Sequence, residues 1–376
     1  MLIYPTLKLS PLQGMAGMGG GVVSRSTMGA GGAVYFPPFT LTLDASNASR
    51  LGDTTSVQNT WWGTQTYDSN VITNIGQQSY QGFYAFTVGI ACNLSATLGG
   101  AAGWGNSRGR SISATFSLSV GDRIVFFAGK PTVKLTYGQQ VGAAGGASCL
   151  MIYDTSLTSD NDYSNGFVPW IIAAGGSASG STHSNTAANW RQIEAVPLST
   201  TGSASSIYNF RSGNGYHGGY TNNSGFDGGI GRNGIQTGGC GWKYGPAGQP
   251  NANPQYGSVR LGLSYGAEGC PFPTASGGSG IDGGFGGGGG DADANYYSAG
   301  GGGYFGGYES HGGDQSGSAY FAYYGPSLSD DRLGPLSFVH TSGTSVSDNG
   351  HHGTGARADQ NNANQIKGRV ELTFNP

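Results

Sequence analysis

The stretch Gly277-Gly-Ser-Gly-Ile-Asp-Gly-Gly-Phe-Gly-Gly-Gly-Gly-Gly290 decides the fold of this chain. Within it, glycine occupies every third position from Gly277 to Gly289, and the same period runs from Gly225 to Gly234. Three residues per turn is the period of the polyproline II helix, a conformation that glycine adopts without proline. A helix face made of glycine has no side chain, so neighbouring helices can approach closely and bond their free N–H and C=O groups to one another. We therefore expect a bundle of parallel and antiparallel polyglycine-II helices.

Both glycine-periodic stretches lie within residues 201–320, which hold 38 of the 73 glycines. The alternative interpretation of residues 201–320 is a flexible linker. Flexible linkers consist mainly of glycine and serine. Here the glycines are interspersed with aromatic residues, which are costly to leave in water. The aromatic residues are Trp242, Tyr244, Phe285, Tyr296, Tyr297, Tyr304, Phe305 and Tyr308. Their presence favours the ordered bundle.

The composition of the whole chain favours an all-β structural protein. Of 376 residues, 73 are glycine and only 10 % are charged, whereas globular chains average about 7 % glycine and about 25 % charged residues. Glycine costs a helix about 1 kcal/mol relative to alanine, which argues against a helical enzyme. The 15 prolines are too few for collagen, and 21 Tyr, 16 Phe and 6 Trp argue against disorder. A net charge of −3 gives no electrostatic reason to expect a nucleic-acid partner.

Several short segments read as β-strands, because apolar and polar residues alternate in them or because turn residues bound a short apolar run. They are 39–44, 82–88, 91–98, 111–118, 123–128, 148–153, 168–174 and 368–374. Many short strands separated by turns predict an all-β sandwich or jelly roll with little α-helix. The last segment most simply rejoins the sandwich. We therefore expect a sandwich of residues 39–174 plus 365–376, with residues 175–364 as a glycine-rich insertion.

Residues 1–38 form a distinct N-terminal segment with glycine clusters and the pair Pro37-Pro38. The segment shows no helical period and cannot bury a core of its own, so we expect an extended arm that docks on another subunit or protein. The alternative is a flexible N-terminus without a fixed conformation. Its first residues lack the basic and apolar regions of a signal peptide, and no stretch reaches the 18 apolar residues that predict membrane insertion.

An ordered series of segments resembles a known family. The series runs Phe86-Thr-Val88, Leu98–Gly103, Ala114–Leu118, Val120–Ile124, Gly129-Lys130, Gly142–Gly146 before Ser148, Pro169–Gly176, Ser298–Gly307 and Gly368–Phe374. It is similar to the glycine-rich extracellular module of the anaplastic lymphoma kinase and leukocyte tyrosine kinase receptors. In that module a TNF-like β-sandwich carries a polyglycine-II bundle, and similar helices occur in the tail-fibre adhesins of T-even-type phages. The resemblance covers roughly residues 82–376. It implies the fold, but not the receptors' cytokine ligand or signalling.

Sites for metals, cofactors or catalysis are not indicated. Asp291, Asp293 and Asn295 begin like an EF-hand loop, but Tyr296 and Gly302 stand where glycine and glutamate are required, so only a looser site at Asp291 and Asp293 stays open. His351 and His352 have no neighbouring ligand residues that complete a site. The cysteines Cys92, Cys149, Cys240 and Cys270 are widely spaced, and we expect free buried thiols. We predict no enzyme activity and no cofactor.

Aromatic residues of the glycine-rich region are the candidates for surface binding. Tyrosine and tryptophan on loops can stack on sugars or on a partner protein. The candidates are Tyr216, Tyr220, Trp242, Tyr244, Tyr304 and Tyr308. Packing between glycine layers is the simpler interpretation of the same residues.

These features together predict a structural component of a virus particle, most simply of a bacteriophage. The protein would be a fibre, a decoration protein or a receptor-binding adhesin on the virion exterior. Residues 1–38 would contact other virion proteins, the aromatics would contact a host glycan or protein, and copies would form a homo-oligomer, commonly a trimer. The alternative is a non-viral extracellular ligand-binding module or surface adhesin.

Overall fold

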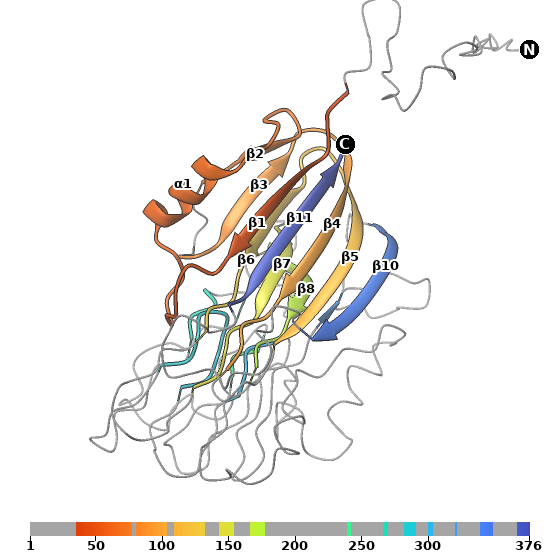
Figure 1. Cartoon of the computed structure of the whole chain (residues 1–376). Coiled ribbons are helices and arrows are strands. Elements are labelled where there is room, and N and C mark those ends of the chain that lie inside the picture. Colours follow the sequence, from red (N-terminus) through yellow and green to blue (C-terminus); the bar gives the residue numbers. More distant parts are fainter. Residues whose placement is uncertain are drawn as a thin grey trace, which may run out of the picture. The chain divides into compact units, whose positions relative to one another are not determined.

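The computed structural model describes residues 35–76, 80–103, 109–131, 143–153, 166–176, 239–241, 263, 266–269, 282–290, 300–303, 320–321, 339–348 and 367–376. The chain divides into two units, residues 1–37 and residues 38–376, and the described elements belong to the second unit. The described part of this unit is mostly β-sheet, with two antiparallel sheets and one α-helix (Figure 1). The predicted all-β class is therefore confirmed.

The first sheet has five strands in the order β1-β11-β4-β5-β10, and each neighbouring pair is antiparallel. Its strands are β1 (Phe39–Asp44), β4 (Cys92–Gly99), β5 (Arg110–Leu118), β10 (Val339–Asp348) and β11 (Arg369–Asn375). The C-terminal strand β11 lies between β1 and β4, with Leu372 opposite Leu41 on one side and Ala96 on the other. The prediction that the end of the chain rejoins the sheet is confirmed.

The second sheet has six strands in the order β2-β3-β6-β7-β8-β9, again antiparallel throughout. Its strands are β2 (Ile72–Asn74), β3 (Tyr84–Val88), β6 (Arg123–Phe127), β7 (Ser148–Tyr153), β8 (Phe167–Ala173) and β9 (Tyr320–Phe321). A turn with Gly121 at φ 92° leads into β6. Strands β9 and β10 come from residues 175–364, where no strand had been predicted.

The alternating pattern of the strands places one face of each in the core. In β5, Ile112, Ala114, Phe116 and Leu118 are buried, while the residues between them are partly exposed. Ring contacts join the two sheets: Phe116 stacks on Trp170 of β8 at 4.9 Å between centroids. Phe86 of β3 meets Phe374 of β11 edge-on at 5.3 Å. The apolar faces of the two sheets therefore share one core.

Helix α1 (Thr55–Thr64) links the sheets along the side where β1 is the edge strand (Figure 1). The indole N–H of Trp61 donates to the carbonyl of Thr42 in β1, and the Thr42 N–H donates to the Gln65 side chain at 3.4 Å. The Trp61 ring also contacts Tyr84 and Phe126 of the second sheet, at 5.0 and 5.9 Å. An edge strand with unpaired backbone groups invites pairing with other chains, and α1 covers the middle of this edge.

Short glycine-rich segments continue beyond the ends of the strands and bond to one another through their backbones. The bonded segments are 99–103, 128–131, 143–147, 174–176, 239–241, 266–269, 283–290 and 300–303. Residues 144–147 donate their N–H groups to three different segments. Those bonds run from Ala144 to Gly289, from Gly145 to Gly176, from Gly146 to Lys130 and from Ala147 to Gly286, each at 2.8–3.1 Å. These backbone groups are buried and hydrogen-bonded, as buried peptide groups require.

Glycine is required at these segments because the backbones touch. A Cβ atom on Gly146 would clash with the carbonyl of Phe285, and one on Gly239 would clash with that of Gly301. Likewise, a Cβ on Gly175 would meet the carbonyl of Gly145. Any larger residue would therefore force neighbouring segments apart.

Candidate functional site

The binding candidates predicted from the sequence lie outside the described residues. These are Tyr216, Tyr220, Trp242, Tyr244, Tyr304 and Tyr308. Asp291, Asp293, His351 and His352 also lie outside them, as do residues 1–34 of the predicted docking arm. Cys92, Cys149 and Cys240 are described and buried, and Cys92 and Cys149 are free thiols, as predicted. Cys270 lies outside the described residues.

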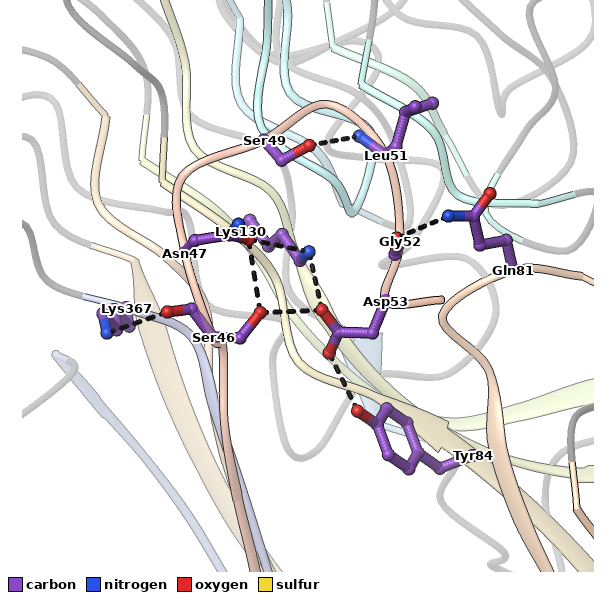
Figure 2. Close-up of polar contacts among 10 residues, drawn as sticks. All are labelled: Ser46, Asn47, Ser49, Leu51, Gly52, Asp53, Gln81, Tyr84, Lys130 and Lys367. Carbon is purple, nitrogen blue, oxygen red and sulfur yellow. Dashed lines mark hydrogen bonds and ion pairs between the residues drawn. The ribbon is translucent and has the colours of Figure 1, made fainter. Parts of the chain in front are cut away.

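A polar cluster that had not been predicted forms where the sheets meet the glycine-rich segments (Figure 2). It combines Ser46, Asn47 and Asp53 from the loop between β1 and α1, Tyr84 from β3, and Lys130 from the segment that follows β6. The two charged side chains at its centre, Lys130 and Asp53, are only 4 % and 8 % exposed. Charged side chains are rarely buried unless they are paired, so these two residues are the most informative polar groups of the described structure.

The cluster is fully connected around the Asp53 carboxylate. Its Oδ1 lies 2.7 Å from Nζ of Lys130 and accepts a 2.7 Å hydrogen bond from the hydroxyl of Ser46. Its Oδ2 accepts a 2.8 Å hydrogen bond from the hydroxyl of Tyr84. Lys130 Nζ also donates to Oδ1 of Asn47 at 3.1 Å, and the Ser46 hydroxyl lies 3.2 Å from that same oxygen.

Burial and the neighbouring polar groups have opposite effects on the pKa of the Asp53 carboxyl group. Burial raises the pKa of Asp53, but the hydrogen bond and positive charge of Lys130, together with the hydroxyls of Ser46 and Tyr84, outweigh burial and place that pKa below its ordinary value. Burial and the neighbouring Asp53 charge raise the pKa of the Tyr84 phenol. The cluster therefore holds Asp53 ionised and Tyr84 as a hydrogen-bond donor at neutral pH.

The loop that carries the cluster also bonds directly to the glycine-rich segments. The carbonyls of Ser49 and Arg50 accept hydrogen bonds from the N–H groups of Phe285 and Gly269, each at 2.8 Å. The Arg50 guanidinium lies 3.3 Å from Glu268. It also lies 3.6 Å from Asp282. From the other side, Lys130 donates its backbone N–H to the carbonyl of Phe285 at 2.8 Å. Residues 46–53 therefore connect the glycine-rich segments to the sheets through hydrogen bonds and ion pairs.

One feature of the sequence indicates a buried charge at this cluster. Lys130 follows the apolar run 123–128 after a single residue, Gly129, in a chain with few charged residues. A lysine at that position is a candidate for burial, but its partners Asn47 and Asp53 are remote in sequence. Among the described residues, no group of three or more His, Cys, Asp or Glu side chains could hold a metal ion. No described helix is long and apolar enough to span a membrane.

Comparisons of the sequence with protein-family models and with curated proteins find no match.

Proposed function

We propose that the protein is a stiff structural part of a virus particle, in which a TNF-like or jelly-roll β-sandwich carries a polyglycine-II bundle. The sandwich is supported by the ring contacts that join the sheets, between Phe116 and Trp170 and between Phe86 and Phe374. The observation that carries the proposal, however, is the hydrogen-bond pattern of the glycine-rich segments.

Residues 144–147 support the polyglycine-II interpretation. The N–H groups of residues 144 and 147, three positions apart, bond to the same segment 283–290, while those of residues 145 and 146 bond to two other segments. A β-strand has only two edges for hydrogen bonding. A helix with three residues per turn directs successive residues to three neighbours and returns to the first after three positions. The pattern of these four residues therefore supports the polyglycine-II helix over a β-strand.

Such a bundle serves structure rather than catalysis. Its backbone groups bond between segments, and its close contacts leave no space for side chains, so it is expected to be rigid and resistant to proteases. Rigidity suits a fibre, a decoration protein or a receptor-binding adhesin on a particle exterior. The similarity to the helices of phage tail-fibre adhesins favours a bacteriophage particle over the non-viral alternative.

The remaining parts of the proposal concern partners. Residues 1–38 attach the protein to other virion proteins, and copies assemble as a homo-oligomer, for which a trimer is the simplest arrangement. The loop aromatics Tyr216, Tyr220, Trp242, Tyr244, Tyr304 and Tyr308 supply the contact with a host glycan or protein.

Amide hydrogen exchange tests the bundle. The amides of residues 144–147, 284–286, 288 and 289 should be protected as strongly as the bonded amides of β4 and β5, because these residues are buried and each of their N–H groups donates a backbone hydrogen bond. Exchange of the glycine amides within seconds, beside protected strands, would show that these segments are a linker.

Particle attachment tests the biological assignment. The full chain should co-purify with particles, and a chain that lacks residues 1–38 should fold but no longer attach. A folded truncated chain that still co-purifies would overturn the role of the arm. Absence of the full chain from particles, with display on a cell surface instead, would favour the non-viral adhesin.

A further inference from the structure

We propose that Lys130 and Asn47 form an intramolecular amide bond that joins the two sheets, with Asp53 as the proton acceptor. The proposal stands on the polar cluster and is independent of the virion assignment. It names a modification site: the Nζ atom of Lys130 and the Cγ atom of Asn47.

The three groups that amide formation requires meet in one place. Lys130 supplies an amine, Asn47 a carboxamide and Asp53 a carboxylate (Figure 2). Nζ lies 3.1 Å from Oδ1 of Asn47, and the Cγ atom that would be attacked is bonded directly to that oxygen. Reacting atoms in productive geometries lie about 3–3.5 Å apart. The reacting atoms are Nζ and Cγ, so the reaction requires the Asn47 side chain to turn its Cγ toward the amine.

The surroundings of the amine favour reaction over simple solvation. The side chains of Lys130 and Asp53 are almost wholly buried, so bulk water does not surround the amine. Asn47 is exposed, which lets the leaving group reach water. A buried ion pair is by itself weak grounds for stability, since apolar replacements are often as stable.

The step balances without any co-reactant. Asp53 accepts a proton from the Lys130 ammonium, and the neutral Nζ attacks Cγ of Asn47 to form the Nζ–Cγ bond. The Cγ–Nδ2 bond then breaks, and Nδ2 takes one proton from Nζ and the proton held by Asp53. It leaves as an ammonium ion. One amide, one ammonium ion and an ionised Asp53 remain, and nothing is oxidised or reduced.

Two neighbouring hydroxyls have defined tasks in this step. Ser46 lies 3.2 Å from Oδ1 of Asn47, where negative charge develops during attack. Its single hydroxyl hydrogen is donated to Asp53 while that carboxylate is ionised, and it can be donated to Oδ1 of Asn47 once Asp53 has taken up the proton. Tyr84 holds the other oxygen of Asp53, which fixes the direction of the carboxylate. Because Asp53 is well stabilised as an ion, proton transfer to it is unfavourable, and the reaction is a slow maturation that each molecule undergoes once.

The bond would link the sheets covalently. Asn47 follows β1 of the five-stranded sheet, and Lys130 follows β6 of the six-stranded sheet. The two residues are 83 positions apart in the chain. A cross-link that closes a long loop restricts the unfolded chain, which is how disulfides are thought to stabilise proteins.

Intact-mass spectrometry of the full chain, incubated at mildly alkaline pH and then denatured, tests the proposal. The expected mass is lower than that of the sequence by one ammonia, and protease digestion should yield one branched peptide that contains both Asn47 and Lys130. The variants Lys130→Arg and Asp53→Ala should keep the full mass. Lys367→Arg is the matched control, because exposed Lys367 donates to the backbone carbonyl of Ser46 rather than to a reacting group, and its replacement should leave the cross-link intact.

Three results would overturn the proposal. One is the full sequence mass after prolonged incubation. Another is a mass lower by one water, which would mean that Lys130 had joined Asp53. The third is loss of ammonia within a single unbranched peptide, which would mean that Asn47 had cyclised onto its own backbone. The wild-type chain decides among these results even if a variant fails to fold.

Discussion

Lys130 Nζ and Asp53 Oδ1 lie 2.7 Å apart in a nearly solvent-free site at the junction of the β-sheets and the glycine-rich segments. The same lysine bonds through its backbone to Phe285 and Gly146. Lys130 therefore belongs to the polar cluster through its side chain and to the hydrogen-bonded glycine-rich segments through its backbone. Substitutions in the polar cluster or in the glycine-rich segments should therefore affect the attachment of these segments to the sheets.

Removal of the Asp53 charge should destabilise the fold strongly. In Asp53→Asn, compared with wild-type protein whose Lys130 amine is still free, the buried Lys130 ammonium would lose its ionic partner, and breaking a buried pair in this way costs about 3–5 kcal/mol. Equilibrium denaturation measures the change in the free energy of unfolding. The control is Glu371→Gln, which breaks a partly exposed pair with Arg369 and should cost at most about 1 kcal/mol. Equal effects of the two substitutions would contradict the importance of the cluster.

Acid should weaken the fold through Asp53 while the Lys130 amine is free. The pKa of Asp53 is lower in the folded protein than its ordinary value of 3.8, so its contribution to stability is complete above that value. The contribution is lost as the pH falls through the lower folded pKa. Denaturation midpoints between pH 2 and pH 7, roughly the span over which carboxylates titrate, should fall less steeply in Asp53→Asn than in the wild type. Parallel curves for the two proteins would show that other carboxylates account for the loss of stability in acid.

Two glycine substitutions should have opposite effects. Gly146→Ala would drive a Cβ into the carbonyl of Phe285, so it should destabilise the protein and speed amide exchange of residues 283–290. Gly63→Ala lies in α1 with nothing within 4 Å of the added atom, and should stabilise the protein by up to about 1 kcal/mol. Thermal unfolding and hydrogen exchange measure both. A harmless Gly146→Ala would contradict the close contact of these segments.

The ring contact between the sheets should be essential for stability. Phe116 is fully buried and stacks on Trp170, so Phe116→Ala should cost about 3–5 kcal/mol through lost burial and the cavity left behind. Phe116→Leu should cost less, because it fills part of the space. Val120→Ala, at an exposed turn, is the control and should change the free energy of unfolding by no more than about 0.5 kcal/mol.

The thiols of Cys92 and Cys149 should resist alkylation in the folded protein. Burial and the nearby charge of Asp122 raise the pKa of Cys92 to about 11, and burial raises that of Cys149 well above its usual range. The thiolate is the reactive form, so iodoacetamide at pH 8 should label neither residue until denaturant is added. Mass spectrometry of the labelled peptides distinguishes them. Rapid labelling of native Cys149 would contradict its burial.

Much of the sheet could be predicted from the sequence because alternation is a local property. The segments 111–118, 123–128 and 148–153 carry their strand signal in their own residues, and each forms a strand. The glycine period likewise predicted close backbone contacts, since only glycine leaves the space for them. Helix α1 had no such signal: its residues show no clear helical period, and it is held by the contacts of Trp61 and Trp62 with the sheets.

The sequence by itself therefore determined the all-β class, most strand positions and the concentration of glycine in one region. Only the tertiary structure decided which strands are neighbours, where α1 covers an edge and that Lys130 meets Asp53 and Asn47. The physical reason is distance along the chain. Periodicity acts between residues a few positions apart, whereas the amine and carboxamide of the polar cluster are separated by 83 positions and meet only after the two sheets have packed together.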